Sequence, residues 1–181
     1  MPHPIVVLIG PPGAGKSRIG KKVAKYLDRD FIDTDSVIVA ENGPIADIFS
    51  TSGEAAFRMI EREVVARSLS SDGVVSLGGG AVIDQETRAE LRSHRVGLLT
   101  VSAEAVSRRI SGQRRPLLAA ESTDDRLAAW QRLVDSRLAV YESLATRTWD
   151  TSVRPITAIA REIADWADKK DSTTATTGTG K

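Results

Sequence analysis

The sequence contains no cysteine, which excludes a disulfide framework and thiolate metal sites and is compatible with a reducing compartment. Long apolar runs are also missing: no segment approaches the roughly 20 apolar residues of a membrane span, and no basic region followed by an apolar one opens the chain. Neither sign of charge predominates, because 25 basic residues face 24 acidic ones. Nucleic acid is therefore not expected as the main partner. We expect a cytoplasmic protein, monomeric and without a membrane partner.

The length of 181 residues suits one domain with one well-buried core. We expect this domain to span residues 1–167. From residue 168 onward the sequence is a low-complexity mixture of Lys, Asp, Ser, Thr, Gly and one Ala, with no large apolar side chain able to pack. Such a composition predicts a disordered tail over residues 168–181.

A glycine-rich motif near the N-terminus carries the clearest chemical signal. The stretch Gly10–Ser17 reads GPPGAGKS and fits the P-loop pattern, Gly followed by any four residues and then Gly-Lys-Ser/Thr. An apolar run over residues 5–9 precedes it, and apolar residues at helical spacing follow it, so the loop joins a predicted strand to a predicted helix. Its amides and the helix N-terminus create an anion site, where Lys16 would reach the β- and γ-phosphates and Ser17 would ligate Mg²⁺.

Two aspartates follow the second predicted strand, which begins at Phe31. Asp33 and Asp35 lie at i and i+2, at the carboxyl end of the strand, where open α/β sheets bind their ligands. The alternative is that Thr34 or Asp35 caps a helix beginning near Ser36. Beside a P-loop, we favour a functional role.

Three consecutive glycines, Gly78–Gly80, follow the third predicted strand at residues 74–77. A flexible linker is the simpler interpretation, but apolar residues stand on both sides of the triplet. Glycines are costly in conformational entropy, so the pattern indicates a backbone that approaches a ligand closely.

The remaining apolar patterns predict a helix-and-strand alternation. Breaks are expected at residues 42–44 and 52–53, further strands at 96–101 and 148–150, and helices between and after them. Alternating strands and helices favour right-handed crossovers and an α/β fold, a parallel sheet covered on both faces. The P-loop, the aspartate pair and the glycine triplet would then meet at the carboxyl edge of that sheet.

The residues alone do not decide the role of two charged groups. Arg58 and Glu61, at i and i+3 of a predicted helix, would be an ordinary surface ion pair. Arg114 and Arg115 lie in a loop stiffened by Pro116, which is either a solvated connector or a lid that closes over phosphate.

A GTPase switch is excluded by what the sequence lacks. No aspartate is followed three residues later by glycine, and the only asparagine, Asn42, is followed by Gly43, so neither an Asp-x-x-Gly turn nor an Asn-Lys-x-Asp base reader is present. Two classes remain: an ATP-dependent phosphotransferase that acts on a small molecule, and a protein of the same shape that only binds its ligand.

At this point the chain resembles the shikimate kinases over about residues 5 to 165. The motifs that carry the resemblance occur in the order and approximate spacing of that family: the P-loop, Asp33-Thr34-Asp35, Phe57-Arg58-x-x-Glu61, Ser76-Leu77-Gly78-Gly79-Gly80-Ala81 and Arg115-Pro116-Leu117-Leu118. The resemblance implies a three-layer P-loop kinase fold, a five-stranded parallel sheet with helices on both faces, a small substrate-binding helical segment and a lid. It also implies transfer of the γ-phosphate of ATP to the 3-hydroxyl of shikimate, in the pathway to chorismate and aromatic amino acids.

The family pattern assigns roles to residues of this chain. An arginine fork suits a carboxylate, and the resemblance gives this role to Arg58 and Arg137, with Glu61 orienting Arg58. Asp35 would hold the substrate hydroxyls and accept the proton of the attacking one. The remaining expected contacts are backbone amides of Gly79 and Gly80 to shikimate, and Mg²⁺ at Ser17 and Asp33.

The nucleotide site is expected to draw on three parts of the chain. The P-loop supplies Gly13, Ala14, Gly15, Lys16 and Ser17. Arg115 matches the lid arginine that neutralises the transferring phosphoryl group, so that Lys16, Asp35 and Arg115 form the expected catalytic set. Arg109 and the pair Arg154-Pro155 resemble the elements that enclose adenine.

The chain departs from the family pattern in two places. Arg18 stands where the family usually has threonine, and this change affects the expected contact to the α-phosphate. Residues 111–114, before Arg115, form a shorter segment than in many members of the family. A related small-molecule kinase, such as one acting on gluconate, and a catalytically idle nucleotide-binding protein are the alternatives.

Overall fold

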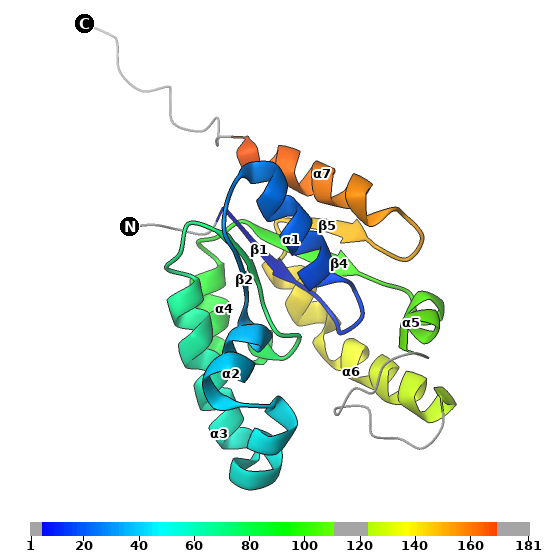
Figure 1. Cartoon of the computed structure of the whole chain (residues 1–181). Helices are drawn as coiled ribbons and strands as arrows, with labels where there is room; N and C mark the ends of the chain where they lie inside the picture. Colours follow the sequence, from blue (N-terminus) through cyan, green and yellow to red (C-terminus); the bar gives the residue numbers. More distant parts are fainter. Residues whose placement is uncertain (1–4, 111–122, 170–181) are drawn as a thin grey trace, which may run out of the picture.

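The computed structural model describes residues 5–110 and 123–169 and contains one parallel sheet of five strands (Figure 1). The strand order is β2-β3-β1-β4-β5, and every neighbouring pair is parallel. The predicted α/β fold with a five-stranded parallel sheet is confirmed. The strands are β1 (Val6–Ile9), β2 (Phe31–Asp33), β3 (Val74–Ser76), β4 (Val96–Thr100) and β5 (Arg147–Asp150).

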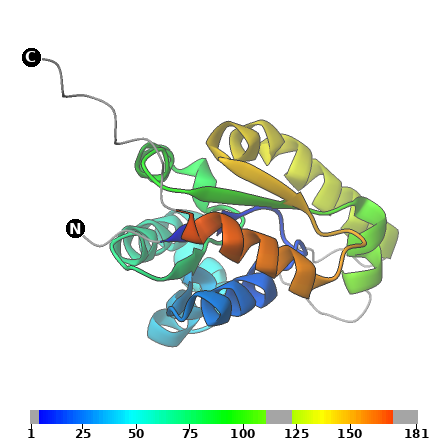
Figure 2. The same cartoon turned by 90° about the horizontal axis from the view of Figure 1, so that it is seen from above.

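Helices connect the strands and cover both faces of the sheet, which gives three layers. Figure 2 shows α1 and α7 on one side of the sheet and α4 and α6 on the other. The helices are α1 (Lys16–Leu27), α2 (Thr34–Asn42), α3 (Ile45–Ser68), α4 (Gln85–Leu91), α5 (Ala103–Ile110), α6 (Thr123–Leu144) and α7 (Ile156–Asp168), with a short 3₁₀ helix η1 (Ala81–Ile83) after the glycine triplet.

The central strand β1 divides its side chains between the two cores. Val6 and Leu8 pack in the cluster under α1 and α7, whereas Val7 and Ile9 pack in the cluster under α3, α4 and α6. Alternate residues of a strand point to opposite faces, and all four are at most 1% exposed. A continuous apolar run is therefore the pattern that a strand buried on both faces requires.

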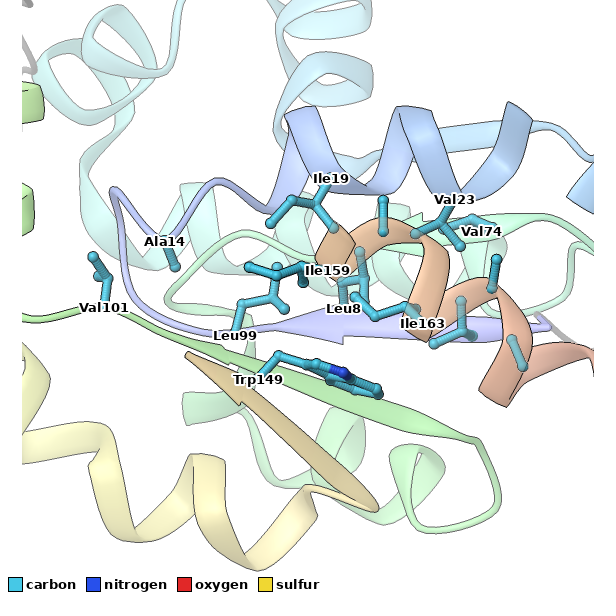
Figure 3. Packing of buried hydrophobic residues seen from close by; sticks show 14 of the residues in the cluster. Leu8, Ala14, Ile19, Val23, Val74, Leu99, Val101, Trp149, Ile159 and Ile163 are labelled. Atoms are coloured by element: carbon cyan, nitrogen blue, oxygen red, sulfur yellow. The ribbon is translucent and has the colours of Figure 1, made fainter. Parts of the chain in front are cut away.

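The core beneath α1 and α7 fixes the helix that follows the P-loop. Figure 3 shows Ile19 and Val23 of α1 facing Ile159 and Ile163 of α7 over strand β1. These four side chains are fully buried, and each such burial contributes about 1.5–3 kcal/mol relative to exposure. The start of α1 is thus held against the sheet, which positions the P-loop at the strand ends.

A third, smaller core lies between α2 and α3, apart from the sheet. It consists of Ile38, Ile48, Phe57 and Val64. The break predicted at residues 52–53 occurs inside α3, where Gly53 adopts φ 81° and kinks the helix. This pair of helices corresponds to the small helical segment that the family resemblance implied.

The ends of the expected domain are only partly described. Helix α7 continues through Asp168, and residues 170–181 lie outside the described residues, so the disordered tail remains a prediction. Residues 111–122, with the expected lid and Arg115, also lie outside them. Among the helices that are described, none combines the length and apolar character needed to cross a membrane.

Candidate active site

A cavity of about 1040 Å³ opens where the sequence places the P-loop, the aspartates and the glycine triplet. Parallel pairing aligns Asp33 of β2 with Ser76 of β3, and Ser76 with Leu8 of β1, so these strands end at one edge. Because loops after neighbouring parallel strands converge there, segments far apart in sequence share one cavity. Its lining includes Gly13–Arg18, Asp33, Asp35, Ile45, Ala46, Phe49, Gly79, Gly80, Arg109, Trp130, Leu133, Arg137 and Ile156.

The P-loop wraps around the side chain of Lys16. The Lys16 ammonium donates hydrogen bonds to the carbonyl oxygens of Gly10 and Pro11, at 2.8 and 3.2 Å. Gly10 adopts φ 142°, and a Cβ at this position would lie 2.2 Å from the carbonyl oxygen of Leu99. Only glycine fits there, because both the backbone angle and the close approach of β4 exclude a side chain.

Three side chains hold the P-loop through its carbonyl oxygens. The Trp130 indole on α6 donates to Pro12 at 2.8 Å, and the Arg109 guanidinium on α5 donates to Gly13 at 2.8 Å. The buried Thr151 hydroxyl lies 2.9 Å from the carbonyl oxygen of Ala14. Carbonyl oxygens repel phosphate, so fixing them leaves the loop amides as its natural anion-binding groups.

Of the residues expected to contact adenine, only Arg109 lines the cavity. Arg109 lines the cavity and is braced by Thr151 as well as by the P-loop. Arg154 is half exposed and forms an ion pair with Glu162, and neither it nor Pro155 lines the cavity, although Ile156 does. Arg18 is exposed on the first turn of α1 and does line it.

Ser17 and Asp33 are brought together as a possible metal-binding pair. The Ser17 hydroxyl donates a short hydrogen bond to Oδ2 of Asp33, and both residues line the cavity. Oδ1 of Asp33 accepts from the Ser36 amide at 3.1 Å, so Asp33 is the N-cap of α2, and the alternative that Thr34 or Asp35 caps this helix is wrong. Within residues 5–110 and 123–169, no group of three or more His, Cys, Asp or Glu side chains is arranged so that it could hold a metal ion. An oxygen pair of this kind fits Mg²⁺, which keeps several waters and takes few protein ligands.

Arg58 and Glu61 form an ion pair in which Glu61 is buried and Arg58 partly buried, and this is not an ordinary surface pair. Nη1 of Arg58 donates to Oε2 of Glu61 at 2.6 Å, and Glu61 is only 4% exposed. Burial raises the pKa of Glu61, and the ion pair with Arg58 partly offsets that rise. Nη2 of Arg58 also contacts Glu54 at 3.2 Å, and its guanidinium lies 5.2 Å from the ring centroid of Phe57. The guanidinium is therefore held from several sides.

Each residue of the glycine triplet lies against a side chain from another element, and two of the three glycines form hydrogen bonds with those side chains. The Gly78 amide donates to the buried Thr34 hydroxyl at 3.0 Å. The Gly79 carbonyl oxygen accepts from Arg137 at 3.0 Å and from the Tyr141 hydroxyl at 2.5 Å, both on α6. A Cβ on Gly80 would lie 2.4 Å from Nη1 of Arg58.

The aspartate predicted to hold substrate hydroxyls lies in the same place. A Cβ on Gly78 would lie 2.5 Å from Oδ1 of Asp35 and 3.1 Å from Oε1 of Glu61. Asp35 also lines the cavity together with Arg137. The structure thus brings Asp35, Arg58, Glu61 and Arg137 to the glycine triplet.

Several residues that shape the site were not identified from the sequence. Trp130, Tyr141 and Thr151 belong to no motif, and Thr34 was considered only as a helix cap. Their polar atoms bond to carbonyls or amides between 42 and 137 residues away along the chain. Such pairings leave no local pattern, so no signal in a single sequence reveals them.

Comparison with known proteins identifies the family. The shikimate kinase family model matches residues 12–168. A shikimate kinase of Corynebacterium efficiens is 44% identical over 165 residues, covering 90% of this chain and 96% of the relative, and one of Mycobacterium avium is 44% identical over 177 residues, covering 96% and 99%.

Solved structures give the same result. Shikimate kinase from Acinetobacter baumannii in complex with shikimate has a TM-score of 0.83 and 30% identity, covering 89% of this chain and 90% of that one. An APS kinase of Mycobacterium tuberculosis, with a TM-score of 0.55 and 16% identity, shares the fold alone. The chain therefore belongs to the shikimate kinase family and is a nucleotide-dependent kinase.

Proposed function

We propose that this chain transfers the γ-phosphate of ATP to the 3-hydroxyl of shikimate, the step that leads toward chorismate and aromatic amino acids. The observation that carries the proposal is the fixed Arg58 guanidinium beside Gly80, a residue that lines the same cavity as the P-loop. A phosphate donor and a small carboxylic acid can therefore be bound side by side. We further propose a cytoplasmic monomer, with residues 1–167 as the catalytic domain.

Shikimate presents one carboxylate and three hydroxyls to this cavity. Arginine binds carboxylates through two parallel N–H donors, and Arg58 and Arg137 reach the glycine triplet from α3 and α6. Glu61 orients Arg58 through their ion pair, and Glu61 itself is buried away from solvent. The amides of Gly79 and Gly80 complete the substrate contacts.

Asp35 is proposed to bind the substrate hydroxyls and to take the proton of the attacking one. Its carboxylate lies against Gly78, on the side of the triplet that Glu61 also approaches. A carboxylate is a suitable acceptor from a hydroxyl, and general bases act from within hydrogen-bond distance. Asp35 thereby aims one hydroxyl toward the P-loop.

The nucleotide is proposed to lie along Gly13, Ala14, Gly15, Lys16 and Ser17, with Arg18 and Arg109 beside it. Ser17 and Asp33 would hold Mg²⁺, which when bound neutralises charge on the β- and γ-phosphates. Lys16 would turn from its own loop carbonyls to the phosphates. Arg115, which is not among the described residues, is proposed to neutralise the transferring phosphoryl group. Arg154 and Pro155 are proposed to border the adenine base.

The substrate is tested by comparing phosphate acceptors. ADP release is measured with ATP, Mg²⁺ and shikimate, gluconate, a nucleoside monophosphate or no acceptor. We expect rapid release with shikimate alone. Faster ADP release with gluconate would show that gluconate, and not shikimate, is the substrate. The same slow ADP release in every mixture would indicate an idle nucleotide-binding protein.

The carboxylate clamp is tested by separate Arg58→Ala and Arg137→Ala substitutions. Each removes one charged donor to the substrate carboxylate, so we expect the KM for shikimate to rise at least about tenfold while the KM for ATP changes little. An unchanged KM for shikimate in both variants would refute the clamp.

A further inference from the structure

We propose that Arg62, through its three carboxylate partners on the segment after the glycine triplet, is a positioning residue for the shikimate subsite. This inference rests on the proposed function, because its readout is the KM for shikimate. Arg62 does not line the cavity, so it would act through other residues. Its place in the fold suggests which ones.

The Arg62 side chain lies among three carboxylates from the start and middle of α4. Its Nε lies 3.4 Å from Asp84 and 3.3 Å from Glu86, and both terminal nitrogens contact Glu90. The Arg62 side chain is 20% exposed, whereas those of Asp84 and Glu90 are each 40% exposed. One guanidinium thus neutralises a local excess of negative charge and joins α3 to α4.

The geometry repeats at the next turn of α3. Arg58 and Arg62 are four residues apart and share one helix face, and Gly80 and Asp84 are four residues apart on the facing segment. Arg58 lies against Gly80, and Arg62 bonds Asp84. The cluster of Arg62 is therefore the next contact between the same two segments that form the substrate clamp.

Asp84 links this cluster to the backbone that follows the glycines. Its carboxylate accepts from the Thr87 amide at 2.7 Å and caps α4, while η1 connects it to Gly80. Holding Asp84 therefore fixes where the triplet ends relative to α3. Loss of Arg62 would remove the ion pairs that attract α4 to α3, and it would leave three neighbouring carboxylates of one segment without the cation they share.

A purely stabilising role predicts different kinetics from a positioning role. Loosening the contact between α3 and the glycine segment weakens shikimate binding but leaves the P-loop, held by Trp130 and Thr151, unchanged. We therefore expect the KM for shikimate to rise about three- to thirtyfold in Arg62→Ala, the range for residues that act on a ligand without touching it. The KM for ATP should stay within about twofold.

The experiment compares Arg62→Ala, Arg62→Lys and Glu90→Gln with a matched control, Arg67→Ala. Arg67 is also an arginine of α3 in an ion pair, but its partner is Glu41 of α2. Steady-state kinetics are measured for both substrates, shikimate binding is measured by calorimetry, and thermal unfolding verifies that each variant is folded at the assay temperature.

We expect Arg62→Lys to restore part of the shikimate affinity, since one ammonium replaces some of the three contacts, and Arg67→Ala to match the parent enzyme. An unchanged KM for shikimate in Arg62→Ala, or equal losses for both substrates, would overturn the inference. If Arg62→Ala does not fold, Glu90→Gln decides by the same criterion. Failure of the parent enzyme to phosphorylate shikimate would instead refute the proposed function.

Discussion

Replacing Gly80 with alanine tests the substrate clamp through a single added carbon. Gly80 adopts φ −95° and ψ −14°, in the right-handed helical region, so alanine fits its backbone without strain. The new Cβ would lie 2.4 Å from Nη1 of Arg58, 3.0 Å from Nη2 and 3.1 Å from Cζ. The perturbation therefore acts on the position of one guanidinium.

The size of the effect follows from these distances. Ordinary contact begins near 3.4 Å, so Nη1 has to move by about 1 Å, which disturbs the geometry of its 2.6 Å bond to Glu61. The substrate carboxylate loses its fitted donor in the same movement. A hydrogen bond to a charged group contributes about 1.5–3 kcal/mol, which corresponds to a rise in the KM for shikimate of about 10- to 150-fold.

Steady-state ADP release, with each substrate varied in turn, measures this change. We expect the KM for ATP to stay within about twofold, and the midpoint of thermal unfolding to change little, because alanine at a compatible position also reduces the entropy of the unfolded chain. A double-mutant cycle with Arg58→Ala is the control: once Arg58 is removed, Gly80→Ala should have almost no further effect. Additive effects, or an unchanged KM for shikimate in Gly80→Ala, would refute the steric reasoning.

Three further predictions address the phosphate site, a buried carboxylate and the end of α7. Lys16→Met should lower kcat by about 100-fold or more while the fold is retained, and near-normal turnover in the same assay would show that the phosphate role is misplaced. Burial raises the pKa of Glu61 above its ordinary value of 4.5. Between these two pKa values the folded chain keeps the Glu61 proton and the unfolded chain has released it. The free energy of unfolding should therefore fall as the pH rises from about 4.5 through the raised pKa. Urea unfolding at a series of pH values should show that Glu61→Gln removes this slope, and identical slopes would contradict it. Arg95 donates to the carbonyl oxygens of Trp166 and Ala167 at the end of α7, so Arg95→Ala should cost about 1–3 kcal/mol of unfolding free energy without changing KM, and an unaltered urea midpoint would count against this.

Much of the framework could be predicted because it is encoded by local patterns. The apolar run before Gly10 and the spacing of Ile19 and Val23 are short-range signals of a buried strand and an amphipathic helix, and both elements are confirmed. Motifs at strand ends then locate the cavity, since parallel strands present their carboxyl ends at one edge. The family resemblance added the pairing of distant motifs that periodicity alone does not give.

The remaining features depend on packing between elements that are distant in sequence. Arg58 and Glu61 have the spacing of any surface pair, and only the contact of α3 with the glycine segment buries Glu61. The alternative that Thr34 or Asp35 caps α2 is wrong because Asp33, Thr34 and Asp35 are all able to cap, and the choice is made by the backbone after β2. The bond from Tyr141 to Gly79 spans 62 residues and leaves no local trace.

The central claim is that a phosphate-binding loop and a carboxylate clamp share one cavity and aim one particular hydroxyl at the nucleotide. The most direct measurement is nuclear magnetic resonance analysis of the product formed by the purified protein from shikimate, ATP and Mg²⁺. The structure-based account predicts a single product phosphorylated at the 3-hydroxyl. Unchanged shikimate, or phosphate distributed over several hydroxyls, would contradict it.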